Sequence, residues 1–345
     1  AETDGQPPVT ITLPTPDGNF ARFTVLESSV MEPGLAQQFP DIKTFVGQGV
    51  DDPYATVRLD HTQHGFHAQV LTPDGTWFVD PVSWGDASTV ASFYKRDLPT
   101  PPGRWQCDVN DAGEPVPEFP TTPYQPRVLT TLKTFRLAVS CTGEYAVNRG
   151  GTVAAAQAAI VTVVNRVTGI YENELGARLS LVANNTNVVF TNAATDPYAN
   201  SGGSGELSIC NAQCNSLIGT ANYDIGHVFE TSDGGIASLN SVCSSVKGQG
   251  LSGLPTPVGD AFAVDYVAHE MGHQFGGRHC FNSCGGGAGD AFTYAYEPGS
   301  GSTIMAYAGI CGTDDLQAHS DAMFHSGSFD VRRLEQAARL GQIID

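Results

Sequence analysis

The stretch that most constrains this chain is HEMGHQFGGRH, residues 269–279. On an α-helix, His269 and His273 are four residues apart and therefore share one face. Two imidazole nitrogens on one face can bind a single zinc ion. Glu270 lies beside such an ion, where it can accept a proton from water. The stretch must therefore form a helix that ends in time for another ligand to approach the same ion.

The end of this helix is set by two glycines. Glycine accepts a positive φ without a Cβ clash, so Gly276 and Gly277 allow the chain to turn. His279 can then swing back as a third ligand. Three protein ligands leave one position for water and substrate, which is typical of catalytic rather than structural zinc. Incidental histidines are the alternative interpretation, but five fixed residues coincide by chance on the order of 10⁻⁸ per start position.

The charge of the chain excludes some partners. Its 345 residues suit two domains. They carry 36 acidic and 17 basic residues, a formal net charge of -19. The first 122 residues hold 17 acidic and 6 basic residues, so both parts of the chain are acidic. Phosphate groups need a basic face, so we expect neither nucleic acid nor an anionic membrane as a partner. No run of 18 apolar residues indicates a membrane span.

The cysteines indicate where the protein works. Eight cysteines, an even number at mixed spacing, predict disulfides and an oxidising compartment. The first residues, AETDGQPP, have neither a basic nor an apolar signal-peptide region, and read like a chain whose signal has been removed. We therefore expect a secreted, extracellular protein.

The first part of the chain is predicted to be β-rich. Short β-branched or aromatic runs are separated by PDG turns. The expected strands are 9–13, 21–27, 55–60, 65–71 and 76–80. Residues 97–127 are rich in Pro, Gly and acids, a linker composition, so we place one region at 1–122 and a second domain at 123–345. Three histidines in the first region lack clustered acidic or cysteine partners, which favours solvated or hydrogen-bonded strand histidines over a metal site. They are His61, His64 and His67.

The second part is predicted to mix helices and strands. Apolar spacing predicts helices at 151–175 and 261–275, the latter with Asp260 as its N-cap. A last helix is expected from about 328 to 340. Expected strands are 134–140, 178–184, 187–190 and 224–230, with 234–239 as a sheet edge. The segments 191–221 and 280–324 are expected to be loops.

The pattern H-E-x-x-H-x-x-G-x-x-H resembles the metzincin clan of zinc peptidases. STIMAYAG, residues 302–309, places Met305 where that clan has its methionine turn. Three further stretches resemble the bacterial reprolysin-like (adamalysin-like) peptidases, over about 130–326: RLAVSCTGEY, YDIGHVFETSDGGIASLNSVC and YEPGSGSTIMAYAGIC. One departure is Cys280, where animal and venom reprolysins usually have Asp.

The resemblance implies a fold and an activity. The fold is α+β: a metzincin catalytic domain with a mixed, mostly parallel sheet, an antiparallel edge strand and a long active-site helix, preceded by a β-rich prodomain. Met305 would form a hydrophobic floor beneath the zinc ligands. Tyr307 would touch the zinc or the transition state, or be an ordinary wall residue. The implied activity is a secreted zinc endopeptidase acting on protein or peptide substrates. Such a substrate would lie extended against an edge strand. The residues of that edge strand would be Gly235, Ile236, Ala237 and Ser238.

The front of the chain also resembles a pro-region, from FTVLESS to ATVRLD. The implied partner is then the protein's own prodomain. Cys107, in the linker, can supply a thiolate that occupies the open zinc position, as in cysteine-switch zymogens. A disulfide to another cysteine is the alternative, and the even cysteine count favours it.

Two other functions are compatible with the motif. One is a catalytically silent, zinc-containing binding or adhesion module, although a structural site does not need the base Glu270. The other is a zinc amidase acting on a non-protein substrate. Acidic and Asn-rich loops also permit Ca²⁺, but no ordered calcium-loop pattern is present.

Overall fold

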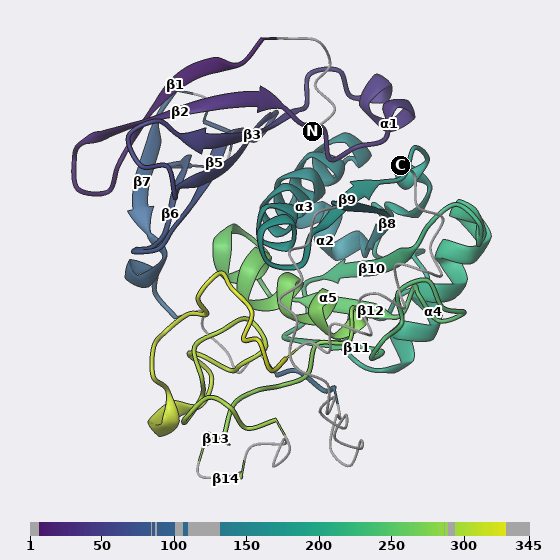
Figure 1. Ribbon diagram of the computed structural model, residues 1–345. Coiled ribbons are helices and arrows are strands. Elements are labelled where there is room, and N and C mark those ends of the chain that lie inside the picture. The colour runs from purple at the N-terminus through teal and green to yellow at the C-terminus, as the bar shows by residue number, and fades with distance from the viewer. Residues whose placement is uncertain are drawn as a thin grey trace.

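The computed structural model describes residues 7–83, 85–86, 88–100, 106–109, 132–285, 287–288 and 294–328. The first part of the chain forms a seven-stranded antiparallel sheet in which each strand pairs with the next along the chain (Figure 1). Its strands are β1 (Val9–Pro14), β2 (Phe20–Glu27), β3 (Lys43–Gly49), β4 (Thr56–Thr62), β5 (Gly65–Thr72), β6 (Gly75–Pro81) and β7 (Val90–Tyr94). A short helix, α1 (Pro33–Gln38), lies between β2 and β3.

The N-terminal sheet follows the alternation seen in its sequence. Phe23, Val57 and Val70 lie in a common apolar core, while Arg58 and Gln69, next to Val57 and Val70, are buried as well. Both PDG turns join paired strands, and Gly18 and Gly75 take positive φ there. All five expected strands are confirmed. The sequence pattern does not predict β3 and β7, because KTFVGQG contains two glycines, which are depleted in strands, and VASFY has only 5 residues.

A second, five-stranded sheet forms the core of the C-terminal part, in the order β11-β12-β10-β8-β9. The strands are β8 (Lys133–Cys141), β9 (Ala177–Leu181), β10 (Ile225–Glu230), β11 (Gly234–Ala237) and β12 (Gly250–Gly253). All neighbouring pairs are parallel except β11 and β12, so the antiparallel strand β11 forms one edge. The chain therefore has an α+β architecture.

The helix α3 (Val153–Leu175) lies between the two sheets and packs against β4 on one side and β9 on the other (Figure 1). Thr152 caps its start by accepting a hydrogen bond from the Ala155 N–H, so the helix begins two residues later than expected. The helix is long and apolar enough to cross a membrane, but 83% of its most apolar window is buried inside the protein. It serves here as the central core helix.

Several expectations for the C-terminal part are wrong. Residues 187–190 form no strand, since Asn185–Val188 is a 3-10 helix in which Asn185 and Val188 are buried. The expected loop 191–221 contains α4 (Gly205–Gln213) and a π-helical turn (Cys214–Gly219). The segment 191–221 is rich in Asn, Gly and Ser, which indicates a loop, and tertiary burial overrides that signal. The helix expected at 328–340 lies almost entirely outside the described residues.

The helix that carries the first two motif histidines has two parts, a π-helix (Ala261–Ala268) and α5 (His269–Gln274). Asp260 is not its N-cap: its own backbone is helical and its side chain makes no cap hydrogen bond. The carboxylate of Asp260 instead lies 3.1 Å from the ammonium nitrogen of Lys95. A long-range ion pair takes the place of the expected local contact.

The remaining C-terminal segment is largely irregular, as expected, with the short elements β13 (Ser283–Cys284), β14 (Gly287–Ala288) and a 3-10 turn (Gly312–Asp314). In the N-terminal sheet, the His64 Nε2 lies 2.7 Å from the Ala155 carbonyl and the His67 Nδ1 lies 3.0 Å from Asp60. His61 is exposed. These histidines form hydrogen bonds or face solvent, as predicted. Most of the predicted linker, 97–127, lies outside the described residues, so the boundary near 122 stays a prediction.

Candidate metal centre

The three motif histidines converge at one point. The Nε2 atom of His273 lies 3.1 Å from that of His269 and 3.1 Å from that of His279, and the remaining pair is 3.3 Å apart. All three rings are fully buried. The turn that returns His279 depends on Gly276, whose φ is +95°. Gly277 helps by donating to the Gly272 carbonyl, without a positive φ of its own.

The outer nitrogens of two rings fix their tautomers. The Nδ1 of His269 lies 2.6 Å from the Ile304 carbonyl, and that of His273 lies 2.8 Å from the Gly277 carbonyl. A carbonyl oxygen only accepts, so each Nδ1 must carry the hydrogen and each Nε2 presents a lone pair. Burial and the neighbouring imidazoles also lower the pKa of His273 well below its usual value. Converging lone pairs cannot bond to one another, and a cation between them fits this arrangement.

Cys107 completes a four-residue cluster with these histidines. Its Sγ lies 3.5 Å from the His273 Nε2, and the four potential ligand atoms lie within 4.8 Å of one another. Cys107 is a free, buried thiol, so the disulfide interpretation is wrong. Burial and the charge of Glu270 raise the pKa of the thiol. A divalent cation in the cluster would act in the opposite direction, since the thiolate is the form that binds metal.

The segment around Cys107 lies along the edge strand β11. The Gly235 N–H donates to the Gln106 carbonyl at 2.9 Å, and the Asp108 N–H donates to the Gly235 carbonyl at 2.9 Å. Cys107 and Gly235 thereby form a parallel β-bridge. Of the predicted edge residues, Gly235, Ile236 and Ala237 belong to β11, while Ser238 follows it. Because β12 occupies the other side, the free side of β11 is taken by the chain's own Cys107 segment.

Glu270 lies at the same place. It is fully buried, and its carboxylate is a neighbour of the Cys107 thiol. Burial raises the pKa of Glu270 well above its usual value, and the charge of Asp108 acts in the same direction. A buried carboxyl group of this kind can hold and release a proton nearer to neutral pH than an exposed one.

Met305 and Tyr307 line the centre from the segment that follows. Met305 is fully buried against the helix, and a Cβ added at Gly272 would lie 2.5 Å from its Sδ. The Tyr307 hydroxyl donates to the Cys107 carbonyl at 3.1 Å. Its ring stacks on Phe281 with centroids 4.2 Å apart and meets the His279 ring edge-on at 4.8 Å. The sequence does not predict Phe281 as part of the centre, because no spacing marks it.

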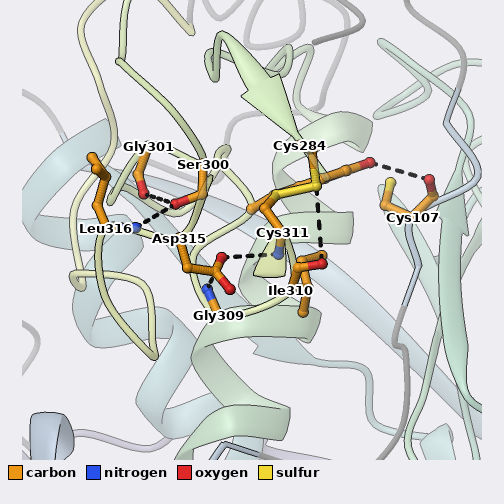
Figure 2. The surroundings of a disulfide bond; sticks show 10 residues. Cys107, Cys284, Ser300, Gly301, Gly309, Ile310, Cys311, Asp315 and Leu316 are labelled. Carbon is orange, nitrogen blue, oxygen red and sulfur yellow. Dashed lines mark hydrogen bonds between the residues drawn. A yellow bond between two sulfur atoms is a disulfide. The ribbon is translucent and has the colours of Figure 1, made fainter. Parts of the chain in front are cut away.

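The segment holding Met305 and Tyr307 is closed by a disulfide between Cys284 and Cys311, with an S–S distance of 2.09 Å. Figure 2 shows Asp315 beside this bond, where its carboxylate accepts from the backbone N–H groups of Gly309 and Cys311 at 3.0 and 2.8 Å. The irregular backbone below the centre is therefore fixed covalently and by hydrogen bonds.

Cys280, the residue after the third histidine, is buried and turned away from the cluster. Its thiol donates to the Glu297 carboxylate at 2.8 Å, and Glu297 also accepts from the Ser302 and Thr303 N–H groups. Burial and the Glu297 charge raise the pKa of Cys280 to about 12. The departure from the usual Asp thus leaves a neutral thiol that connects this segment to the methionine turn.

Comparison with protein families agrees with this geometry. Residues 131–329 match the model of the family described as metallo-peptidase family M12B, reprolysin-like. One similar solved structure is metalloproteinase-II from Bacteroides fragilis, 9% identical over 96% of this chain and 92% of that chain, at a TM-score of 0.45. No curated protein sequence matches the chain. The family match spans more than half of the sequence and all of the residues that form the centre except Cys107, so the chain belongs to the M12B reprolysin-like metallo-peptidases.

Proposed function

We propose that this chain is the latent precursor of a secreted, zinc-dependent endopeptidase of the metzincin type. One observation carries the proposal: the buried Nε2 atoms of His269, His273 and His279 converge, and Glu270 lies beside them. Three imidazoles in fixed positions are a fitting donor set for zinc. When bound, zinc polarises a peptide carbonyl and lowers the pKa of water toward about 7.

The chain's own residues supply the remaining chemistry. Glu270 accepts a proton from water and passes it to the leaving amine, a role suited to a carboxyl group whose pKa is raised by burial. The Tyr307 hydroxyl now donates to the carbonyl of Cys107. In the open enzyme the same hydroxyl can donate to the carbonyl oxygen of a substrate, where charge develops during hydrolysis. Met305 supports the ligands from below.

The substrate takes the place of the Cys107 segment. That segment already uses the backbone N–H and C=O of Gly235 on the free side of β11. A peptide substrate can make equivalent backbone hydrogen bonds there, with little dependence on its sequence. Cys107 would therefore block both the backbone docking edge and the fourth ligand position. Latency follows from this double occupation, and residues 1–122 act as a prodomain.

The location of the protein is part of the proposal. The disulfide between Cys284 and Cys311 supports an oxidising, extracellular compartment. The acidic composition of both parts of the chain favours solubility there. The same net charge of -19 would repel nucleic acid and an anionic membrane.

A silent binding module is the weaker alternative, because burying Glu270 beside three imidazoles is unfavourable and a purely structural site gains nothing from it. A zinc amidase acting on non-protein substrates differs in what it cleaves. A casein digest after removal of the N-terminal segment separates the endopeptidase from the amidase. Chelator-sensitive cleavage of casein supports the endopeptidase, and intact casein contradicts it.

The proposed mechanism is tested by Glu270→Gln. The variant should bind zinc in the same stoichiometry as the wild type, measured by mass spectrometry of the metal. After removal of the N-terminal segment, its casein turnover should fall by about 10²–10⁴-fold relative to the wild type treated in the same way, the scale of a lost general base. Asp321→Asn, at an exposed acidic residue of the C-terminal part, is the control and should leave turnover unchanged. Equal turnover in Glu270→Gln and wild type would rule out this mechanism.

A further inference from the structure

The N-terminal sheet contacts the rest of the protein at places far from the metal centre. Beside β9, the Leu181 N–H donates to the Val30 carbonyl and the Glu32 N–H donates to the Leu181 carbonyl, each at 2.8 Å. On α3, the Asn165 amide donates to the Leu59 carbonyl at 3.0 Å. Two of these contacts join backbone groups and one joins a side-chain amide to the backbone, and none involves a residue of the metal centre.

One contact in this interface is a buried ammonium group. Lys95, in the 3-10 turn Lys95–Asp97 after β7, is 4% exposed. Its Nζ lies 2.7 Å from Asp265 and 3.1 Å from Asp260. Both carboxylates are also buried and belong to the start of the helix that carries His269. The contact therefore joins the N-terminal sheet directly to the active-site helix.

The charges of this group make it hard to separate. Burial alone lowers the pKa of Lys95, but the two carboxylates outweigh burial and the pKa is raised, so the lysine is charged at neutral pH. Burial raises the pKa of Asp260, and Lys95 opposes that shift. Removing one partner of a buried ion pair leaves an uncompensated charge, which is strongly unfavourable. The carboxylates therefore retain the lysine as long as water does not enter.

A histidine closes the same group from the C-terminal segment. His319 bridges the two parts of the chain: its Nδ1 lies 2.9 Å from Asp265 and its Nε2 lies 2.9 Å from the Leu98 carbonyl. Arg166, on α3, pairs with Asp80 of β6 and adds positive charge near Asp260. Lys95 is thus held in a recess built for a cation, with further bonds on either side.

We propose that Lys95 is a metal-independent anchor that keeps the N-terminal sheet bound to the active-site helix after the chain has been cut in the linker. The inference rests on the proposed precursor function and extends it. Cys107 and Lys95 are then two separate restraints: the first blocks the centre, and the second holds the whole sheet in place. While Lys95 stays between Asp260 and Asp265, the N-terminal fragment remains bound to the C-terminal part even when the linker is cut or the metal is removed.

The test measures retention of the N-terminal fragment. A recognition site for a specific protease is placed between residues 110 and 131 of the full chain, the chain is cut, and the fragments are separated by size exclusion with and without chelator. In the wild type we expect the fragments to co-elute in both conditions. In Lys95→Met, which keeps the length of the aliphatic side chain, the retained fraction should fall at least tenfold. Lys43→Met is the matched control, since Lys43 forms a half-exposed ion pair with Glu27 in the same sheet, and it should retain the fragment.

A second variant tests the same contact in case Lys95→Met fails to fold. Asp265→Asn leaves Lys95 in place, removes one charge from its recess and should also weaken retention. The double variant should retain no less fragment than Lys95→Met alone, because both changes remove one interaction. Wild-type retention in both single variants overturns the proposal, as does release of the wild-type fragment by chelator alone. Retention needs no peptidase activity, so an inactive protein would contradict the proposed function without deciding this result.

Discussion

The thiol of Cys107 and the carboxylate of Glu270 share the space beside the three imidazoles. Burial and the Glu270 charge raise the pKa of the thiol, and burial raises that of Glu270. In the proposed precursor, a thiol in this place would both supply a metal ligand and cover the proposed base. At this single residue the proposed latent and active forms of the protein differ.

Replacing Cys107 with Ala should therefore activate the uncut chain. We expect peptidase activity to rise roughly 10-fold or more, the scale on which changes in the ligand surroundings act. Hydrolysis of a quenched fluorescent peptide by the uncut protein measures this. Cys243→Ala, at another free cysteine, is the control. If Cys107→Ala is as latent as the wild type, the thiol does not restrain the enzyme.

The helix that carries His269 and His273 packs closely against Met305 because one of its positions, Gly272, has no side chain. Gly272 lies between the two motif histidines, and Met305 fills the space beside it. Any Cβ at this position would meet the Sδ at 2.5 Å, and the flexible methionine would have to move. The glycine in the middle of a helix is therefore explained by close packing of two elements.

Gly272→Ala should destabilise the protein by about 1–3 kcal/mol, the usual cost of overpacking a core, despite the better helix propensity of alanine. Urea unfolding followed by circular dichroism gives the free energy. Gly205→Ala is the matched control, because Gly205 begins α4 and a Cβ there meets nothing within 4 Å. A stabilising effect of Gly272→Ala would show that the turn is not packed against the helix.

The end of β10 and the start of α4 bring two carboxyl groups together. Glu230 accepts from the Gly202 N–H at 3.0 Å, and Glu206 accepts from the Ser201 N–H at 2.7 Å. Burial and the charge of Glu206 raise the pKa of Glu230 to about 8. The native state therefore keeps a proton that the unfolded chain loses at lower pH. Stability falls as pH rises from about 4.5 to about 8, because the native state binds more protons in that window.

Glu230→Gln should remove this pH dependence. We expect the variant to be more stable than the wild type by up to a few kcal/mol at about pH 8, and by much less near pH 4.5. Thermal unfolding at several pH values measures the difference. Glu27→Gln, on the N-terminal sheet, should show no such trend. A stability difference that does not vary with pH would show that Glu230 is not the group that holds this proton in the native state.

Across the whole molecule, a metal at the centre would connect three separate parts of the chain. His269 and His273 belong to the helix, His279 to the loop after it, and Cys107 to a segment from the N-terminal part, 166 positions before His273. A ligand that binds only the folded state stabilises it by mass action. A bound metal should therefore stabilise the folded chain in addition to its proposed part in catalysis.

Chelation should lower the thermal unfolding midpoint of the full chain by about 5 °C or more. Calorimetry with and without a strong zinc chelator measures the shift, and added zinc should restore it. In His273→Ala the chelator should have little effect, because the central donor is gone. An unshifted wild-type midpoint together with a protein free of zinc would contradict the proposed metal centre.

The amino-acid sequence by itself determined the parts of this protein that depend on short spacings. The i, i+4 histidines, the intervening Glu270 and the turn at Gly276 follow from helix geometry and from the freedom of glycine, so the sequence alone predicts them. Five strands of the N-terminal sheet and the helix α3 follow from periodicity in the same way. Local rules suffice where the contact partners are a few residues apart.

Only the tertiary structure decided which distant residues meet. The even cysteine count favours a disulfide for Cys107, yet the fold carries this thiol to the imidazoles. Asp260 is of a residue type that is common at N-caps, yet its carboxylate forms an ion pair with Lys95. No spacing encodes these pairs, because burial and Coulomb attraction depend on which segments the fold brings together. The motif therefore predicts a metal centre, and only the packing of the N-terminal part against it places Cys107 beside the three imidazoles.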